Sequence, residues 1–316
     1  MGRSDELRLI ARVARMYYGE SLTQSAIARQ LSLSQASVSR LLKRAHDEQI
    51  VHISIDVPRG TFPDLEDRLR ERYGLDEAIV ADCDEDREEP ILSSIGEAAA
   101  HFLESTLKDG DVIGISSWSQ TLLRMVDNIH PMKRVAASKV VQTLGGMGNP
   151  GVEIHATQLT MRLARLTQAE PILLSAPGVA ASTAGRLVLV GDPFVRSALD
   201  EFRNITLALL GIGAVQPSEV LARSGNVFTH EELEGLARRG AVGDISLRFF
   251  DAQGRAVVAP LDERVIGMTL DEIKAIPRVV GLAGGSRKVD AIRGVLLGHY
   301  VDVLITDRFT AAKLVV

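Results

Sequence analysis

The chain has 316 residues, 46% of them hydrophobic and 24% charged, and a formal net charge of −5 at pH 7. These values describe a folded globular protein with room for a small domain and a large one. No apolar run is long enough to span a bilayer, and the N-terminus lacks the apolar core of a secretory signal, so we expect a cytoplasmic protein without membrane contact. Cys83 is the single cysteine, which excludes an internal disulfide, and the seven histidines show no metal-binding spacing; we expect no metal and no cofactor.

Two helices that cross through a tight turn are predicted between Gln24 and Arg44, after a first amphipathic helix that covers residues 7–17. Ala28 is small enough for the crossing helices to approach, and Val38 lies on the inward face of the second one. Ser32 occupies the turn, where glycine is the easiest residue, so we expect some backbone strain there. The spacing as a whole is typical of a helix-turn-helix. The alternative is an ordinary helical hairpin whose basic face is merely solvated.

Ser34 is a good N-cap for the second helix, so its next turns should face a major groove of DNA. Glutamine and arginine side chains can bond to adenine and guanine edges, while basic and hydroxyl groups contact phosphates. The residues predicted to bind DNA are Thr23, Gln24, Ser34, Gln35, Ala36, Ser37, Ser39, Arg40, Lys43 and Arg44.

Residues 51–57, VHISIDV, alternate between apolar and polar and predict a half-buried strand, either a wing or a lead-out arm. Through Val57 the chain has eight Lys or Arg and six Asp or Glu, a net charge of +2; the remainder, with 28 against 35, carries −7. A charge of +2 is too small for strong DNA binding by one copy, so we expect several copies on one site.

The sequence PRG at residues 58–60 breaks the strand, and apolar residues then recur at helical spacing in FPDLEDRLRERY. We predict three parts: a DNA-binding domain at 1–57, a hinge helix at 58–75 and an effector domain at 76–316. The apolar edge of the hinge helix packs on its own domain or pairs with another subunit. The acidic segment 82–90, DCDEDREEP, is interpreted as a solvated connection.

Buried strand patterns alternate with helical ones over the rest of the chain, in the order EAIVAD, DVIGIS, KVVQTLGG, ITLALLGIG, VVGLAGG and VDVLITD. Apolar strands that alternate with helices indicate an α/β fold with a doubly wound, mostly parallel sheet. In such sheets the ligand crevice lies beyond the carboxyl ends of the strands. Functional residues are therefore expected directly after each strand.

Several strand ends carry groups suited to a ligand. Hydroxyls and backbone N–H groups within residues 116–121 could hold a phosphate or sugar hydroxyls, with Trp118 either stacking on a sugar or packing the core. Arg287 and Lys288 lie at a helix start, where cations are disfavoured unless an anionic group shares the site, although Arg287 is equally well explained by solvation. The candidates are Ser116, Ser117, Trp118, Ser119, Thr121, Gln142, Gly145, Gly146, Asp244, Gly284, Gly285 and Lys288.

The segments LARRGAVGDISLRFFDAQG, VVGLAGGSRKVDAIRGVLLGHYVDVLITD, QTLGG and GISSWSQTL, behind a helix-turn-helix, resemble the SorC family of bacterial transcriptional regulators. The resemblance implies a Rossmann-like domain related to glucosamine-6-phosphate deaminase and ribose-5-phosphate isomerase. It also implies a sugar, sugar-phosphate or polyol effector, and a homotetramer on operator DNA.

By this resemblance, residues 116–121 would hold the effector's phosphate or terminal hydroxyls, Gln142 and the Gly145–Gly146 loop would line the sugar, and Asp244 and Lys288 would contact it from the other side. Many members read GISWGxTL where this chain reads GISSWSQTL. The longer loop with Trp118 favours an effector without phosphate.

The predicted function is regulation of carbohydrate metabolism, with the effector acting on the DNA-binding domain through the hinge at residues 58–73. The rival is a sugar-phosphate isomerase or deaminase with an added DNA-binding domain. Its titratable candidates are Asp244, Asp307, His155 and Lys288, but no pair has a spacing that demands acid–base chemistry. An NAD-binding protein ranks last, because LGIGAV lacks the third glycine of the nucleotide-binding fingerprint.

Overall fold

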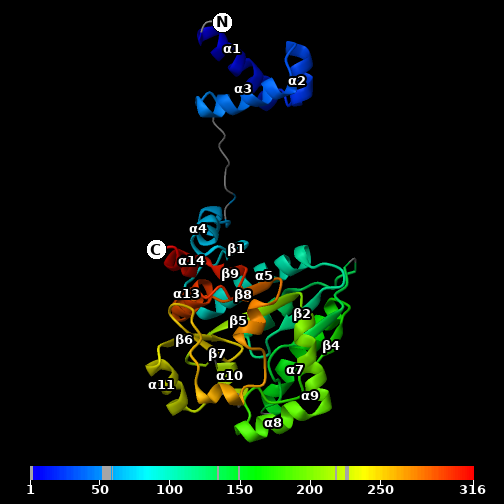
Figure 1. Cartoon of the computed structure of the whole chain (residues 1–316), viewed down its shortest axis with the longest axis vertical. Coiled ribbons are helices and arrows are strands. Elements are labelled where there is room, and N and C mark those ends of the chain that lie inside the picture. Colours follow the sequence, from blue (N-terminus) through cyan, green and yellow to red (C-terminus); the bar gives the residue numbers. More distant parts are fainter. Residues whose placement is uncertain are drawn as a thin grey trace. The chain divides into compact units, whose positions relative to one another are not determined.

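The computed structural model describes residues 3–51, 58, 60–133, 135–148, 150–217, 219–224 and 228–316, without the side chains of 150–155, 219, 220 and 224. The chain divides into two compact units, residues 1–58 and 59–316 (Figure 1). Apart from Val51, the strand predicted at residues 51–57 lies outside the described residues. No helix in the described part of the chain is long and apolar enough to cross a membrane.

The first unit is helical and contains the predicted helix-turn-helix. Val13, Ile27 and Val38 are fully buried where its helices meet. The Thr23 hydroxyl accepts a hydrogen bond from the Ala26 N–H (3.3 Å), and the Ser34 hydroxyl accepts one from the Ser37 N–H (3.1 Å), which confirms Ser34 as an N-cap. Its elements are α1 (Arg3–Ala14), the π-helical turn η1 (Arg15–Gly19), α2 (Gln24–Leu31) and α3 (Gln35–Asp47).

The turn between α2 and α3 has the strain that its sequence predicts. Ser32 adopts a left-handed conformation with φ of +55°, and its N–H bonds to the carbonyl of Arg29. A side chain in this region costs roughly 1–2 kcal/mol relative to the right-handed conformation. The turn between α2 and α3 is therefore formed at a cost in backbone conformational energy at Ser32.

The second unit is an α/β domain. Its strands are β1 (Glu77–Ala81), β2 (Val112–Ile115), β3 (Lys139–Gln142), β4 (Glu170–Ile172), β5 (Leu207–Ala214), β6 (Ala241–Ile245), β7 (Arg248–Asp251), β8 (Val279–Leu282) and β9 (Val303–Asp307). Its α-helices are α4 (Pro63–Tyr73), α5 (Glu88–Thr106), α6 (Gln120–Asn128), α7 (Pro150–Leu166), α8 (Thr183–Gly191), α9 (Pro193–Asp200), α10 (Glu219–Ser224), α11 (His230–Arg238), α12 (Leu270–Lys274), α13 (Val289–Leu297) and α14 (Arg308–Leu314). Short 3₁₀ turns lie at η2 (Glu201–Asn204), η3 (Pro260–Arg264) and η4 (Ser286–Lys288).

The strand order is β1-β9-β8-β5-β2-β3-β4 with every pair along this path parallel, which confirms the doubly wound, mostly parallel sheet. The hairpin β6–β7 is antiparallel, and it extends from β5 through an antiparallel pairing of β5 with β6. Along β5, Leu207 and Leu209 belong to one hydrophobic cluster and Ala208 and Leu210 to another. This alternation is that of a sheet buried on both faces. After β4 the chain returns to the far side of β2, so the strand order reverses between β2 and β5.

Helix α4, the core of the predicted hinge segment, packs on the second unit. Leu69 and Tyr73 are buried against this unit, and the Tyr73 hydroxyl donates to the carbonyl of Leu314 (2.8 Å). Arg68 and Arg72 both donate to the carbonyl of Val315 at 3.0 Å. Of the two roles considered for this helix, the structure therefore shows packing on its own domain, at the end of α14.

Helices α5 and α6 cross closely at Gly96, and a methyl group there should separate them. A Cβ atom on Gly96 would lie 2.6 Å from the Cβ of Arg124 and 2.9 Å from its carbonyl carbon. We expect Gly96→Ala to lower the free energy of unfolding by about 1–3 kcal/mol, measured by urea titration of the full chain. Gly235→Ala is the control, because Gly235 lies within α11 with only the end of Arg238 nearby, and alanine there should stabilise by about 0.5–1 kcal/mol. A neutral or stabilising Gly96→Ala would contradict the close crossing.

Candidate functional site

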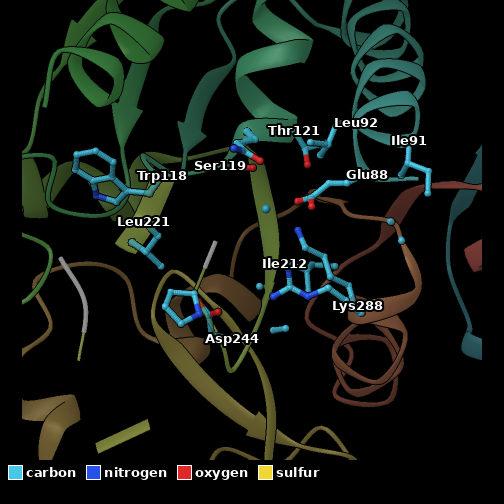
Figure 2. Close-up of a pocket in the computed structure, with 18 of the residues that line it drawn as sticks. Glu88, Ile91, Leu92, Trp118, Ser119, Thr121, Ile212, Leu221, Asp244 and Lys288 are labelled. Carbon is cyan, nitrogen blue, oxygen red and sulfur yellow. The ribbon is translucent and has the colours of Figure 1, made fainter. Parts of the chain in front are cut away.

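A cavity of about 480 Å³ opens at the carboxyl ends of β2, β5 and β8, where the strand order reverses. This is the position at which doubly wound sheets bind ligands. Five segments supply most of its lining, and Figure 2 shows their side chains converging from the turn after β2, the start of α5, β5, the β6–β7 hairpin and the loop after β8. These lining residues lie within 86–92, 116–121, 211–217, 244–247 and 284–288.

The turn after β2 brings hydroxyl groups to the cavity, as the sequence predicts. Ser116, Ser119 and Thr121 all line it. The Ser119 hydroxyl caps α6 by accepting from the Leu122 N–H (3.3 Å). A Cβ atom on Gly211 would lie 2.6 Å from that hydroxyl, so a glycine in β5 is what allows this turn to approach.

Trp118 also lines the cavity, but a hydrogen bond fixes its side chain in the cavity wall. Its indole is 7% exposed, and Nε1 donates to the carbonyl of Gly145 (3.1 Å). Figure 2 shows the ring to one side of the cavity, near Leu221. The side chain therefore combines the packing role with one surface that faces a ligand.

Four of the predicted contact residues, Ser117, Gln142, Gly145 and Gly146, do not line the cavity, and the expectation of direct contacts from them is corrected here. The Gln142 amide donates to Ser117 Oγ (2.8 Å) and accepts from the Leu174 N–H (3.1 Å). A Cβ atom on Gly146 would lie 2.0 Å from Gln142 Nε2, so the glycine admits this buried amide rather than a ligand. These four residues lie behind the cavity lining and support it.

Asp244 enters the cavity from the β6–β7 hairpin. Its Oδ2 accepts from the Leu247 N–H (2.9 Å), and a Cβ atom on Gly213 would lie 2.1 Å from Oδ1, so only glycine fits opposite it in β5. Burial raises the pKa of Asp244 to about 6, against the opposing effects of the Leu247 hydrogen bond and the Lys288 charge. A buried carboxylate with one oxygen unbonded is suited to accept a hydrogen bond from a ligand.

The turn that joins β6 to β7 is strained. Ser246 and Leu247 have φ of +51° and +62°, the left-handed values that a two-residue hairpin turn requires, although neither is glycine. Ser246 lines the cavity, is 5% exposed, and its hydroxyl has no hydrogen-bond partner among the described residues. The turn thus combines a strained backbone with an unsatisfied hydroxyl at the cavity wall.

Lys288 approaches from the loop after β8. The loop is fixed at Gly285, whose φ is +92° and whose N–H donates to Asp307 Oδ2 (3.0 Å) and to Thr310 Oγ1 (2.8 Å). Figure 2 shows the Lys288 side chain directed into the cavity. Burial lowers its pKa, and the carboxylates of Asp244 and Glu88 partly offset that effect. Gly284 and Arg287 line the cavity beside it, Arg287 being exposed.

Asp307, a candidate acid in the rival enzyme hypothesis, is a structural residue. Its fully buried carboxylate accepts from the N–H groups of Phe309 and Thr310 (both 2.9 Å) and from the Thr310 hydroxyl (2.6 Å), in addition to Gly285. It therefore caps α14 and ties β9 to the Lys288 loop. The side chain of His155, another candidate in that hypothesis, lies outside the described residues.

The sequence interpretation missed the start of α5. Glu88, Ile91 and Leu92 line the cavity, as do Asp86 and Glu89. The acidic segment 82–90 is, as expected, a largely exposed connection that leads from β1 into α5, but it also contributes to the cavity. The segment follows β1, and β1 is parallel to its neighbour β9. The expectation that ligand-binding residues follow the carboxyl ends of parallel strands therefore applies to this segment as well. In the described part of the chain, no group of three His, Cys, Asp or Glu could hold a metal ion.

In the first unit, helix α3 presents a polar face to solvent. Of the residues predicted to bind DNA, Gln35, Ala36, Ser39, Arg40 and Lys43 of α3 are exposed, while Ser37 of α3 and Gln24 of α2 are half-buried. Arg40 Nη2 donates to Ser37 Oγ (3.2 Å), which also bonds to Ser34 Oγ (2.8 Å). Thr23 and Ser34 remain exposed as caps.

Arg44 does not offer a free charge to DNA phosphates. Its guanidinium pairs with Glu6 of α1 and with Glu48 (2.6 Å), and these hydrogen bonds raise the pKa of Arg44. Two carboxylates therefore already neutralise it. The prediction of a phosphate contact is corrected to a tie between α1 and the end of α3.

The raised pKa of Asp244 predicts a specific dependence of stability on pH. Between about 3.8 and 6 the folded protein binds more protons at this residue than the unfolded chain, so stability falls as pH rises through that window. Asp244→Asn keeps an acceptor for the Leu247 N–H and should remove up to about 3 kcal/mol of that fall. Urea titrations from pH 3.5 to 6.5 measure it, with the exposed Asp290→Asn as control. Equal slopes in wild type and Asp244→Asn would contradict the burial of this charge.

Comparison with known proteins identifies the families that the two units match. The family model described as "Putative sugar-binding domain" matches residues 60–316, and the model of sigma-70 region 4 matches residues 11–48. The chain is 33% identical to the deoxyribonucleoside regulator of Bacillus subtilis over 98% of each chain, and 34% identical to the erythritol catabolism regulatory protein EryD of Brucella abortus over 97% and 96%. The crystal structure of the full-length sorbitol operon regulator SorC from Klebsiella pneumoniae superposes with a TM-score of 0.74 at 30% identity, covering 98% of this chain and 99% of that one. The protein belongs to the SorC family of transcriptional regulators, with a helix-turn-helix unit joined to a sugar-binding domain.

Proposed function

We propose that this regulator binds operator DNA through α3, binds a sugar, sugar phosphate or polyol in the cavity, and changes its operator affinity when the cavity is occupied. The observation that carries the proposal is the cavity itself. It lies at the sheet reversal, and its Lys288 ammonium has no hydrogen-bonding or ion-pairing partner among the described residues. The names of the relatives, which refer to deoxyribonucleosides, erythritol and sorbitol, support polyhydroxylated compounds as the effector class.

On the DNA side, Gln35 and Arg40 are proposed to read base edges and Lys43 to contact phosphate. Arg40 is already oriented by Ser37, so less side-chain entropy is lost when its guanidinium meets a guanine. Arg44 is paired with Glu6 and Glu48, and the net charge of the first unit through Val57 is only +2. This supports binding by several units together.

On the effector side, Ser116, Ser119 and Thr121 are proposed to bond one end of the ligand, and Asp244 and Lys288 the other. Hydroxyl groups accept as well as donate, so a sugar or polyol can satisfy both the ammonium and the carboxylate. Trp118, Gly284 and Gly285 would contact the ligand through shape complementarity. No cofactor is part of the proposal.

Catalysis is not part of the proposal either. The carboxylate of Asp307 is occupied by structural hydrogen bonds, and the relatives named above are regulators. Incubation with fructose, ribose and glucosamine phosphates should yield no product.

The coupling between effector and DNA is proposed to run from the Lys288 loop to the segment 58–75, between a DNA-binding part at 1–57 and an effector-binding part at 76–316. The support is a chain of hydrogen bonds: Gly285 to Asp307 at the start of α14, and Leu314 at its end to Tyr73 of α4. An effector can shift operator affinity only by its preference between two arrangements, typically about 1–3 kcal/mol.

Self-association, with a homotetramer as the expected state, is proposed to use the face formed by α8 and α9. Leu187, Val188 and Phe194 are 61%, 76% and 84% exposed there, and α8 has no fully buried residue. Its single charged side chain, Arg186, turns inward to the carbonyl of Val265 (2.9 Å). An exposed apolar face suits a second copy of the same chain, because in a symmetric contact the face meets itself.

The function predicts specific, salt-sensitive DNA binding that an effector changes. Fluorescence anisotropy with palindromic sites from the DNA around its own gene should show binding whose affinity shifts about 5–150-fold with one sugar, polyol or sugar phosphate. Lys43→Ala should weaken all sites alike and reduce the dependence of log affinity on log salt by about 1. Lys108→Ala, an equal charge change in the second unit, is the control. Absence of specific binding under all conditions would refute the function.

The interface proposal predicts that a charge on the α8–α9 face breaks the assembly. Val188→Asp should lower the oligomeric state in light scattering without lowering thermal stability by more than a few degrees, because Val188 is largely exposed. Leu297→Asp, at a half-exposed apolar position of α13, is the control. An unchanged assembly in Val188→Asp would place the interface elsewhere.

A further inference from the structure

Glu88 and Ser246 line the cavity, and the proposed function leaves both unused. We propose that they act with Lys288 as a subsite for neighbouring hydroxyl groups, so that the effector is an uncharged polyol or sugar recognised without a phosphate. The inference rests on the proposed function and narrows the ligand class of the same cavity.

Glu88 places a negative charge opposite Lys288. It lies at the first position of α5, and Figure 2 shows its side chain reaching into the cavity toward Lys288, on the side where Ser119 and Thr121 lie. The carboxylates of Glu88 and Asp244 both lie close enough to the Lys288 ammonium to interact with it electrostatically. Like that ammonium, the Glu88 carboxylate has no hydrogen-bonding or ion-pairing partner among the described residues. Lys288 is thus flanked by two acids from different elements.

The charges around the cavity leave no surplus for an anion. At the rim, Asp86 pairs with Lys313 (3.1 Å) and Glu89 with Arg124 (2.8 Å). Arg87 pairs with Glu85. The other charged lining residues, which have no such partner within the described part of the chain, are two acids and two bases, Glu88, Asp244, Arg287 and Lys288.

A phosphate would therefore be repelled at a place whose other groups favour an anion. The start of α6 offers N–H groups and hydroxyls that suit an anion. The Glu88 carboxylate points to the same space and would repel a phosphate bound there, although solvent reduces this repulsion because Glu88 is exposed. A hydroxyl group meets no such penalty, because it donates to the carboxylates and accepts from the ammonium.

Ser246 supplies an independent observation. Ser246 lines the cavity, and its hydroxyl is buried without a hydrogen-bond partner among the described residues, which costs free energy. The strained turn holds it beside Asp244, whose Oδ2 is fixed by the Leu247 N–H. A ligand hydroxyl bonded to both would satisfy the serine and the free carboxylate oxygen together.

The test compares three matched pairs on the full-length protein: sorbitol with sorbitol 6-phosphate, erythritol with erythritol 4-phosphate, and 2-deoxyribose with its 5-phosphate. Thermal shift selects the pair that binds, and titration calorimetry gives both dissociation constants. We expect the unphosphorylated member of at least one pair to bind more tightly. Glu88→Gln should then shift the ratio of the two constants toward the phosphate by roughly ten-fold or more, because one repulsive charge is removed.

Glu97→Gln is the matched control, since Glu97 is an exposed residue of the same helix that does not line the cavity. An unchanged ratio in Glu88→Gln, tighter binding of the phosphate by wild type, or no binding of any of the six compounds would each overturn the subsite. Specific operator binding by the same preparation would in every case leave the regulatory function standing. Sugar binding without operator binding would refute the function and keep the subsite.

Ser246→Ala separates recognition from folding. The hydroxyl has no partner in the free protein, so its removal should leave the melting temperature of the free protein unchanged or higher. It should weaken the best unphosphorylated ligand by about five-fold through the lost hydrogen bond. A lower melting temperature with unchanged affinity would show a structural role and contradict the proposal.

Discussion

The reversal of strand order between β2 and β5 is the constraint on which the rest of the second unit depends. Because the seven strands of the main path are parallel, their carboxyl ends lie along one edge, and the connections diverge where the order reverses. The cavity is the space left by that divergence. Hydroxyls after β2, a carboxylate from the β6–β7 hairpin and an ammonium after β8 meet there although they are far apart in the chain.

Close packing of small residues turns this space into a defined site. Gly211 and Gly213 on β5 leave room for the Ser119 hydroxyl and the Asp244 carboxylate, each of which would collide with a Cβ atom. On the other side, Asp307 holds the loop that carries Lys288 by bonding to the Gly285 N–H. Opposite charges are thus fixed in a partly dry cavity without contacting each other, where electrostatic effects exceed those in water.

The sequence determines local structure and the direction of strands well, but it does not reveal which distant side chains will pair. The helix-turn-helix, the cap at Ser34, the strain at Ser32 and the parallel sheet follow from spacing and short-range geometry. Arg44 looked like a phosphate contact because its ion pair with Glu6 spans 38 positions of the chain. Gln142 looked like a ligand contact because its partner, the N–H of Leu174, lies 32 residues away. Glu88 was missed because a run of acidic residues resembles a solvated loop until the edge of the sheet is considered.

The turn at Ser246 and Leu247 shows where this chain has accepted a thermodynamic cost. Glycine at either position would adopt the same left-handed backbone without strain. Serine and leucine there mean that the resting protein is less stable than its fold allows, in exchange for a hydroxyl held in one direction and an apolar side chain closing the cavity wall. A change in this two-residue turn would alter the wall of the cavity and leave the parallel sheet unchanged, because the turn only joins β6 to β7.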